Sequence, residues 1–413
     1  MRTVLIVGAG IVGISSAIWL QRSGYKVIVV DRVGPASGAS HGNAGVLASG
    51  SIMPIPNPSL LKRLPKMLLR TDSPLFIKTS YIPKVLPFLL EYLSHSSTKE
   101  VQKYARAMAP LIRDSVDQHK QLAKGTQADS FIKEVDYCFG YESERAFQQD
   151  RQVWKLREDL GYNFETCQGS GFSSSDPFYA GLFEVIVRCK NHGKISDPGK
   201  YIKTLSDHFI LQGGELIISD VKDIRLTNNN LVKSSIEGDT ITSDKVIIAT
   251  GAWSKNLLKN FQLKVPLESE RGYHIEFINP NQYPKNPMMV TSKKFVITPM
   301  NGRIRVAGLV EFAGLNTGSR NGPLNLLKNQ IKKLFPNLEY EGQTEWLGHR
   351  PALTDSLPML GPLDREKRIF LAFGHQHLGL TGGAKTGRIV SDLIMEKEIN
   401  LNISNYRPDR FTK

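Results

Sequence analysis

The chain of 413 residues is long enough for two or three domain cores, and its 40% hydrophobic and 22% charged residues are typical of a globular protein. Its three cysteines, Cys138, Cys167 and Cys189, form no CxxC pair, which argues against a disulfide framework or a metal site and favours a reducing compartment. The formal net charge of +14 is compatible with an anionic membrane surface, nucleic acid, an acidic substrate or simply a solvated basic surface.

The first thirty residues predict a strand, a helix and a second strand. An apolar strand from Arg2 to Val7 runs into a G-x-G-x-x-G sequence, a helical apolar pattern follows it to about Gly24, and a second apolar strand ends at Asp31. The stretch from Thr3 to Leu20 differs from a signal peptide, because its glycines lie at fixed turn positions and no A-x-A-like cleavage site follows. Together these features form the dinucleotide-binding fingerprint.

Each part of the fingerprint has a physical role at a pyrophosphate. Gly8 allows the tight turn, Gly10 lets the backbone approach the phosphates, and Gly13 lets the helix pack closely on the strand. The free N–H groups of the helix N-terminus face the phosphates, and Asp31 is placed to accept hydrogen bonds from a ribose. We therefore expect a dinucleotide site formed by the following residues: Gly8, Gly10, Ile11, Val12, Gly13, Asp31 and Arg32.

Residues 34–50 are much richer in glycine, alanine and serine than an ordinary loop. Small side chains let such a backbone wrap a phosphate or a flat ring. The run Ser40-His41-Gly42-Asn43-Ala44-Gly45 resembles the second phosphate-binding stretch of the D-amino acid oxidase-like flavoenzyme family, which includes D-amino acid dehydrogenase, glycine oxidase and sarcosine oxidase. That family uses FAD, so the resemblance implies that Ser40, Asn43, Ala44 and Gly45 contact this cofactor.

Later segments resemble the same family. Residues 211–216 followed by Val221 resemble the strand that lies against the adenine, and residues 244–253 resemble the strand that returns to the cofactor through Thr250 and Gly251. The stretch 346–361 is similar to the family's W-x-G-x-R-P…D-x-x-P-x-x-G block, and 373–387 is similar to its final flavin loop and helix. The resemblance implies further FAD contacts in that loop: Gly374, Leu378, Gly379, Leu380 and Thr381.

The resemblance extends from Val4 to Tyr406, is weakest between 101 and 193, and implies an α/β fold (α+β overall) with two domains. A Rossmann-like FAD-binding domain, discontinuous in sequence, is expected from residues 1–57, 194–262 and 345–413. A mixed β-sheet substrate domain is expected mainly from residues 58–193, together with 263–344. Residues 265–277 and 295–311 alternate apolar and polar side chains, which predicts strands of this second sheet.

The substrate of such a flavoenzyme must be held with the carbon next to its nitrogen over flavin N5, so positioning supplies much of the catalysis. The carboxylate of an amino acid is a strong handle, and a guanidinium that makes two parallel hydrogen bonds is the best clamp for it. Relatives use the arginine of the W-x-G-x-R-P block in this way, so the resemblance implies that Arg350 is the clamp. The alternative is an arginine that only braces the flavin loop through Asp355.

Other side chains are candidates near the reacting centre. Tyr273 matches a G-Y element of the dehydrogenase branch and could bind the substrate carboxylate, or it could simply pack on a half-buried strand. His377 lies in the final flavin loop and is either a proton relay or a structural residue, whereas bracing of the loop is favoured for His375. A covalent flavin link through His41 is not expected, since covalently linked relatives place their histidine one residue later.

Residues 58–94 mix leucine, phenylalanine and isoleucine with six basic residues. Basic charge beside an apolar face favours a segment that lies on an anionic bilayer, and the dehydrogenase branch has a similar stretch. We expect a cytoplasmic protein with peripheral contact to the cytoplasmic face of the inner membrane. A substrate-domain helix pair with a basic outer face is the alternative. No uncharged apolar run reaches 18 residues, so no transmembrane helix is predicted.

The favoured function is FAD-dependent oxidation of a D-amino or imino acid, with D-proline or hydroxy-D-proline suggested by the similarity of residues 374–388 to the branch that handles such imino acids. Electrons would pass to a quinone or another acceptor that is not oxygen. A glycine- or sarcosine-type oxidase that produces peroxide is one alternative. A tRNA-modifying relative is another, but no stripe of basic and aromatic residues supports it, and we expect no nucleic-acid partner.

Overall fold

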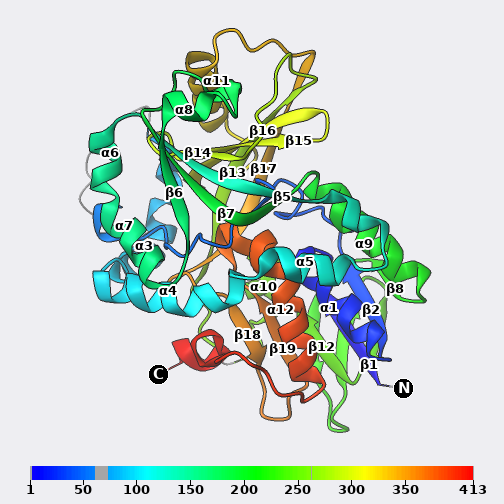
Figure 1. Cartoon of the computed structure of the whole chain (residues 1–413). Coiled ribbons are helices and arrows are strands. Elements are labelled where there is room, and N and C mark those ends of the chain that lie inside the picture. The colour runs from blue at the N-terminus through cyan, green and yellow to red at the C-terminus, as the bar shows by residue number, and fades with distance from the viewer. Residues whose placement is uncertain (1, 61–72, 262, 413) are drawn as a thin grey trace.

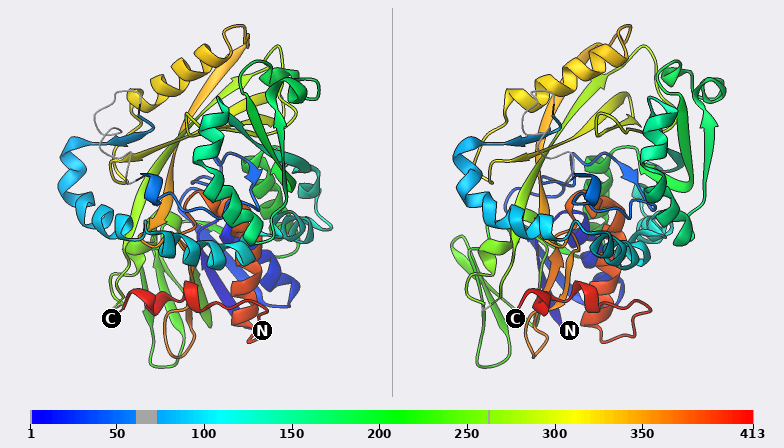
Figure 2. Two further views of the ribbon diagram at one scale, coloured as in Figure 1. Left: turned by 60° about the vertical axis from the view of Figure 1, so that its left-hand side comes forward. Right: turned by 90° about the vertical axis from the view of Figure 1, so that its left-hand side faces the viewer.

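Two large β-sheets organise the computed structural model of the protein, which describes residues 2–60, 73–261 and 263–412 (Figure 1). A six-stranded sheet contains the N-terminal strand, and a ten-stranded sheet stands above it. The two termini lie at the same end of the molecule, on the side of the six-stranded sheet (Figure 2). The predicted fold class, an α/β protein with a Rossmann-like sheet and a second mixed sheet, is confirmed.

The six-stranded sheet is parallel except for its antiparallel β18–β19 edge. In spatial order its strands are β18 (Met359–Pro362), β19 (Ile369–Phe373), β12 (Lys245–Ile248), β1 (Thr3–Val7), β2 (Lys26–Asp31) and β8 (Glu215–Ile218). Strands from the beginning, middle and end of the chain are therefore neighbours, as the sequence predicts for the discontinuous domain.

The side chains of β1 point alternately to the two faces of this sheet, and each face is covered by a further layer, so the sheet is the middle of three layers. Val4 and Ile6 pack into one hydrophobic cluster with the helices, whereas Leu5 and Val7 pack into another on the opposite face. Because both faces are covered, the strand is apolar throughout. The helices of the first face are α1 (Ile11–Arg22), α5 (Ser115–Ala123), α9 (Pro198–Leu211) and α12 (Gly379–Ile394). A small antiparallel sheet covers the other face: β9 (Asp223–Leu226), β10 (Val232–Ile236) and β11 (Asp239–Ser243).

The ten-stranded sheet is mixed. Its main path runs through β17 (Gly342–Leu353), β13 (Leu267–Ile278), β16 (Arg303–Phe312), β15 (Phe295–Met300), β14 (Met288–Val290), β5 (Ile132–Tyr141), β7 (Val185–Ile195) and β3 (Val46–Leu47). Two short strands pair beside this path: β4 (Leu75–Ile77) with β16, and β6 (Phe164–Gln168) with β7. Helix α11 (Asn321–Leu334) covers the sheet and packs into its hydrophobic cluster (Figure 2).

The remaining helices lie in the connections between strands. They are α3 (Ile82–Ser94), α4 (Thr98–Ile112), α6 (Glu144–Gln149), α7 (Arg151–Asp159), α8 (Gly169–Ser173) and α10 (Ser254–Leu257). Short 3-10 turns complete the set: η1 (Thr79–Tyr81), η2 (Gln127–Phe131), η3 (Pro177–Tyr179), η4 (Gly251–Trp253), η5 (Gln376–Leu378), η6 (Ser404–Tyr406) and η7 (Pro408–Phe411). Among the described residues, no helix is both long and apolar enough to cross a bilayer.

Two of the expected domain ranges differ from the sheets that their residues join. The boundary at residue 345 falls inside β17, and β3 lies in the expected range 1–57 but pairs with β7 of the ten-stranded sheet. Helices α4 and α5, from the range expected to be mainly substrate domain, contact α12. The domain ranges remain a prediction. Within the segment 58–94, residues 61–72 lie outside the described part of the chain.

Candidate active site

A cavity of about 1650 Å³ lies between the two sheets. Single small-molecule pockets are usually about 300–1,000 Å³. This cavity is therefore large enough for a dinucleotide and a second small molecule. Its wall includes loops that follow the carboxyl ends of β1, β2 and β12, together with residues of β13, β16 and β17.

Most of the predicted site residues line this cavity. They are Gly8, Gly10, Ile11, Val12, Asp31, Arg32, Ser40, Asn43, Ala44, Val221, Thr250, Gly251, Tyr273, Arg350, His377, Leu378, Gly379, Leu380 and Thr381. Three predicted glycines, Gly13, Gly45 and Gly374, are not among the residues that line the cavity. They allow close packing of the segments behind its wall. A Cβ on Gly45 would stand 2.8 Å from the Ile195 carbonyl oxygen, and one on Gly374 would stand 2.4 Å from the Leu353 side chain.

The glycine-rich turn after β1 is tightly constrained. Gly8 has a φ of +109°, and a Cβ there would lie 2.6 Å from the carbonyl oxygen of Ala249. A Cβ on Gly13 would lie 1.9 Å from the carbonyl oxygen of Gly8, so α1 can approach the turn only with glycine at this position. Gly10, the N-cap of α1, offers no capping side chain, and the first turn has no acidic residue. This helix N-terminus therefore presents its positive end to the cavity.

Asp31 holds the same turn from the end of β2. Its Oδ2 accepts a hydrogen bond from the Ala9 N–H at 2.8 Å, and its Oδ1 accepts from the N–H groups of Val33 and Gly34, both at 2.9 Å. Each carboxylate oxygen has more than one acceptor position. A ribose contact by Asp31 remains a prediction that is compatible with these bonds.

An aromatic and cationic stack continues the wall beyond Asp31. The Arg32 guanidinium carbon lies 4.0 Å from the centre of the Trp253 ring, and the His349 ring meets the same tryptophan edge-on at 5.3 Å. Burial lowers the pKa of His349 to about 4, with the nearby arginines as further causes. This imidazole is therefore neutral near pH 7, and the positive charge of the stack is that of Arg32, held over the tryptophan ring.

The loop from residue 40 to 50 is fastened to both domains. Ser40 Oγ accepts a hydrogen bond from the Ile11 N–H at 3.2 Å, and Asn43 Oδ1 accepts from the Gly45 N–H at 2.9 Å. Buried Arg305 of β16 donates to the His41 carbonyl at 3.1 Å. At its far end, Thr381 at the start of α12 bonds the backbone of β3 and the residue after it.

The residues present fit FAD. The N-termini of α1 and α12 both open into the cavity, and neither first turn has an acidic residue. Such helix ends favour phosphates and other electron-rich groups. At the α12 end, His377 Nδ1 and Gln376 Oε1 are buried and have no hydrogen-bond partner among the residues that the structure describes. Buried polar atoms without partners are rare in native proteins, so these two atoms indicate a bound polar group.

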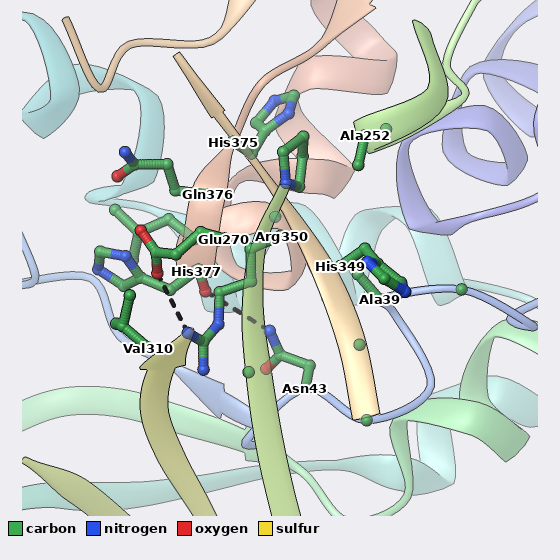
Figure 3. A pocket seen from close by; sticks show the side chains of 18 of the residues that line it. Ala39, Asn43, Ala252, Glu270, Val310, His349, Arg350, His375, Gln376 and His377 are labelled. Atoms are coloured by element: carbon green, nitrogen blue, oxygen red, sulfur yellow. Dashed lines mark hydrogen bonds and ion pairs between the residues drawn. The ribbon is translucent and has the colours of Figure 1, made fainter. Parts of the chain in front are cut away.

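Arg350 lies at the part of the cavity next to the α12 loop (Figure 3). It stands directly opposite Glu270 in the β13–β17 pair, so the two side chains share one face of the sheet. Arg350 Nη1 lies 3.1 Å from Glu270 Oε1 and donates to the Leu309 carbonyl at 2.9 Å, while Nη2 donates to the Gly308 carbonyl at 3.4 Å. The side chain keeps 20% of its surface accessible, so one part of the guanidinium faces the cavity.

Two glycines make room for this arrangement. Gly272 and Gly348 are paired across the same two strands. A Cβ on Gly272 would lie 2.2 Å from Arg350 Nη2, and a Cβ on Gly348 would lie 1.8 Å from the Trp346 ring. The pair leaves a flat floor between Arg350 and Trp346, both of which line the cavity.

Glu270 is fully buried behind Arg350. Burial raises the pKa of Glu270, and the adjacent Arg350 opposes that shift. One of its oxygens, Oε2, has no hydrogen-bond partner in the described part of the chain. Burial also lowers the pKa of His377 to about 4, with the charge of Arg350 as the second cause, so His377 is neutral at pH 7. Figure 3 shows Glu270, Arg350, Gln376 and His377 gathered around one space.

The structure places Asp355 and Tyr273 away from this cluster. Asp355 Oδ2 pairs with Arg410 Nε at 2.7 Å, so it is Glu270, and not Asp355, that holds Arg350. The Tyr273 hydroxyl donates to the buried Glu311 at 2.5 Å, on the face of β13 opposite to Glu270. This contact favours the packing alternative for Tyr273, and its binding of a substrate carboxylate remains an untested prediction.

The two other candidate histidines have local partners. His375 is buried and its Nε2 lies 2.9 Å from Thr386 Oγ1 of α12, which agrees with a bracing role. The His41 ring packs against Trp346, with ring centres 6.1 Å apart, and His41 is outside the residues that line the described cavity.

Sequence reasoning missed Glu270 and Gln376. Glu270 lies two residues before Gly272, so strand alternation alone puts both on one face. Its pairing with Arg350 depends on the register of two strands 80 positions apart, for which the sequence has no local signal. Gln376 lies inside a recognised loop, but its position between two histidines gave no indication of which side chain would face the cavity.

Comparison with known proteins supports one family. Residues 3–393 match the model of the DAO family, described as FAD dependent oxidoreductase. A D-amino-acid oxidase of Bradyrhizobium diazoefficiens is 33% identical over 99% of each chain, and a D-amino acid dehydrogenase of Rhizobium rhizogenes is 25% identical over 99% of each chain.

Solved structures share the fold. A glycine oxidase from Bacillus cereus has a TM-score of 0.76 at 21% identity over the whole of both chains. An L-proline dehydrogenase from P. horikoshii has a TM-score of 0.73 at 17% identity over 99% of this chain and 97% of that one. Because the family model and the Bradyrhizobium relative both span nearly the whole chain, this protein is a member of the DAO family of FAD-dependent oxidoreductases, with FAD as its cofactor.

Proposed function

We propose that the protein oxidises the C–N bond of a D-amino or D-imino acid, with D-proline or a hydroxy-D-proline as the first candidates from the sequence. The observation that carries this proposal is Arg350, which is held by Glu270 and two carbonyls and still faces the cavity beside the flavin loop. A guanidinium in a fixed position is the group best suited to orient a carboxylate. The curated relatives named D-amino-acid oxidase and D-amino acid dehydrogenase support the same substrate class.

The residues of the chain would orient the substrate and control its protonation. Arg350 would bind the α-carboxylate and thereby fix the position of the Cα–H bond in the cavity. FAD, when bound, would supply the hydride acceptor. An amine releases a hydride most readily when its nitrogen is unprotonated. Nδ1 of neutral His377 and Oε2 of Glu270, which have no hydrogen-bond partner among the described residues, could accept hydrogen bonds from the substrate ammonium. Glu270, whose pKa is raised by burial, is the better base of the two and could take up the proton.

The test of this proposal is product formation from enantiomer pairs. We expect D-proline and cis-4-hydroxy-D-proline to give cyclic imines and D-alanine to give pyruvate with ammonium, whereas the L-enantiomers give no product. Glycine and sarcosine separate this function from its alternative. Turnover confined to glycine and sarcosine would replace the D-amino acid assignment by a glycine- or sarcosine-type oxidase.

The electron acceptor is part of the proposal. We propose a quinone or another acceptor that is not oxygen, as in the dehydrogenase branch. The name of the relative called D-amino-acid oxidase makes oxygen the second candidate for the acceptor. Reoxidation of the reduced protein separates them: rapid recovery with a quinone analogue and slow recovery in air supports a dehydrogenase. Rapid recovery in air with peroxide supports an oxidase.

Helix α3 belongs to the segment that we propose to contact a membrane. Ile82, Leu86 and Leu90 recur every four residues and are 42%, 46% and 63% exposed, so they form one apolar stripe, whereas the exposed Lys84 lies on another side of the helix. All three apolar side chains also line the cavity, where an apolar acceptor could enter from a bilayer. An exposed apolar stripe with a basic residue on another face is the pattern of a helix that lies in a membrane interface.

Flotation with anionic phospholipid vesicles tests this contact. We expect the wild-type protein to float with the vesicles and the double variant Leu86→Ser/Leu90→Ser to remain at the bottom, because the variant loses the exposed apolar stripe. Leu211→Ser is the matched control, since Leu211 is 80% exposed on α9, outside the α3 stripe. A wild-type protein that does not float would contradict the membrane proposal.

A further inference from the structure

A second arginine faces the same cavity from the substrate-domain side. Arg157, on α7, is only 6% exposed and lines the cavity. Its guanidinium carbon lies 4.3 Å from the centre of the Trp154 ring and 5.4 Å from that of Phe139, so aromatic side chains hold the group. Its Nε donates to the Gly50 carbonyl at 2.9 Å, which leaves both terminal nitrogens without a hydrogen bond among the described residues.

Among the arginines that the structure describes as buried, Arg157 differs in having no acidic partner. Arg271 lies 3.3 Å from Glu311, and Arg305 lies 2.8 Å from Glu276. Arg157 enters no ion pair among the described residues, and the nearby Asp150 accepts instead from the Tyr141 hydroxyl at 3.2 Å. Burial of an unpaired charge is strongly unfavourable, and the usual remedy is a bound counter-charge. The site therefore indicates an anionic ligand.

The backbone places Arg157 close to the reacting end of the cavity. The Gly50 peptide is held on both sides, because its N–H donates to His192 Nε2 at 3.0 Å and its carbonyl accepts from Arg157. Ser51, which follows Gly50, lines the cavity. Ala48, which lies two residues before Gly50, donates its N–H to Thr381 Oγ1 at the start of α12.

The sheet sets the separation of the two arginines. Phe139, which Arg157 contacts, is on β5, and the carbonyls that hold Arg350 are on β16, three strands away. At about 4.8 Å per strand the two guanidinium groups are on the order of 10–15 Å apart. With about 4 Å for each guanidinium–carboxylate contact, the space between them fits a molecule whose two carboxylates are at most about 7 Å apart.

We propose that Arg157 binds a second carboxylate of the substrate, so that the preferred substrates are acidic D-amino acids such as D-glutamate. This inference rests on the proposed function, in which Arg350 takes the α-carboxylate. Arg350 is already neutralised by Glu270, whereas the charge of Arg157 is uncompensated, so the side-chain carboxylate completes the charge balance of the cavity. Neutral substrates such as D-proline leave Arg157 unpaired and are expected to be poorer.

Calorimetric binding of acids that cannot be oxidised tests the site apart from turnover. With the FAD-loaded protein, we expect glutarate to bind at least about tenfold more tightly than pentanoate, which has the same chain length and one carboxylate. Arg157→Met should remove this difference. Arg151→Met is the matched control, because Arg151 begins the same helix and is exposed, and it should keep the difference.

Steady-state kinetics provide the second readout. The Arg157→Met change should lower kcat/KM for D-glutamate by about 100-fold and change that for D-proline less than about threefold. Arg157→Lys, which keeps the charge, should give a kcat/KM for D-glutamate between those of the wild type and Arg157→Met. This variant replaces Arg157→Met in the test if the methionine protein does not fold. Equal binding of glutarate and pentanoate by the wild type, or a glutarate preference that survives in Arg157→Met, would overturn the inference.

The outcomes separate this inference from the proposed function. If D-proline is oxidised and glutarate binds no better than pentanoate, the second carboxylate site is wrong and the proposed function stands. If glutarate binds tightly through Arg157 and no amino acid is oxidised, the anion site stands and the proposed function fails.

Discussion

Replacement of Arg350 by lysine is expected to lower kcat/KM for D-amino acids by about 100- to 1,000-fold. Lysine keeps the positive charge but cannot hold Glu270 and two carbonyls while it presents a second pair of donors to a carboxylate. Loss of one partner from a buried, hydrogen-bonded charge pair costs about 2–5 kcal/mol, and each 1.4 kcal/mol is about tenfold. The weakened clamp should also misplace Cα, so kcat should fall as well as substrate affinity.

The measurement is the rate of flavin reduction under anaerobic conditions over a range of substrate concentrations. Arg188→Lys is the matched control, because Arg188 of β7 also pairs with a carboxylate, Asp136 at 2.6 Å, and lies outside the residues that line the cavity. It should keep the wild-type rate. An Arg350→Lys protein with full FAD content and a rate within about threefold of wild type would show that another residue positions the carboxylate.

Replacement of Gly13 by valine is expected to abolish FAD binding. A Cβ at this position would lie 1.9 Å from the carbonyl oxygen and 3.0 Å from the carbonyl carbon of Gly8. Because these atoms are backbone, no side-chain rotation can relieve the contact, and α1 must move away from the turn that presents its N-terminus to the pyrophosphate. We expect affinity for FAD to fall at least about 100-fold, since the loss combines several phosphate contacts.

Absorbance of FAD retained after gel filtration measures this loss, and circular dichroism reports whether the fold survives. Gly171→Val is the matched control. A Cβ on Gly171 meets nothing within 4 Å, and this residue of α8 is exposed. A Gly13→Val protein that remains yellow after dialysis would contradict the assignment of this turn to the pyrophosphate.

The dinucleotide half could be predicted because its signals are local. The turn glycines, the helix after them and Asp31 follow one another within about thirty residues, and each is needed by the backbone itself. The strands of that sheet come from distant parts of the chain, and the resemblance of residues 244–253 and 373–387 assigned these parts to one domain but predicted no strand order.

The substrate half depends on register between distant strands. Arg350 could be found through the family block, but Glu270 becomes its partner only because β13 and β17 align residues 270 and 350. Arg157 lies in the span of weakest resemblance and reaches the cavity through its position on α7. One signal was available and missed: residues 295–311 form two strands, β15 and β16, joined at Asn301-Gly302, where Gly302 has a φ of +69°. An Asn-Gly pair between apolar runs is typical of a hairpin turn.

The visible spectrum of the purified protein, recorded under anaerobic conditions while D- and L-amino acids are added in turn, tests most directly whether the protein is a D-amino acid-oxidising flavoenzyme. We predict that the flavin bands lose their absorbance with D-amino or D-imino acids and persist with the L-enantiomers, as this function requires. Flavin bands that no amino or imino acid bleaches, in a protein saturated with FAD, would contradict it.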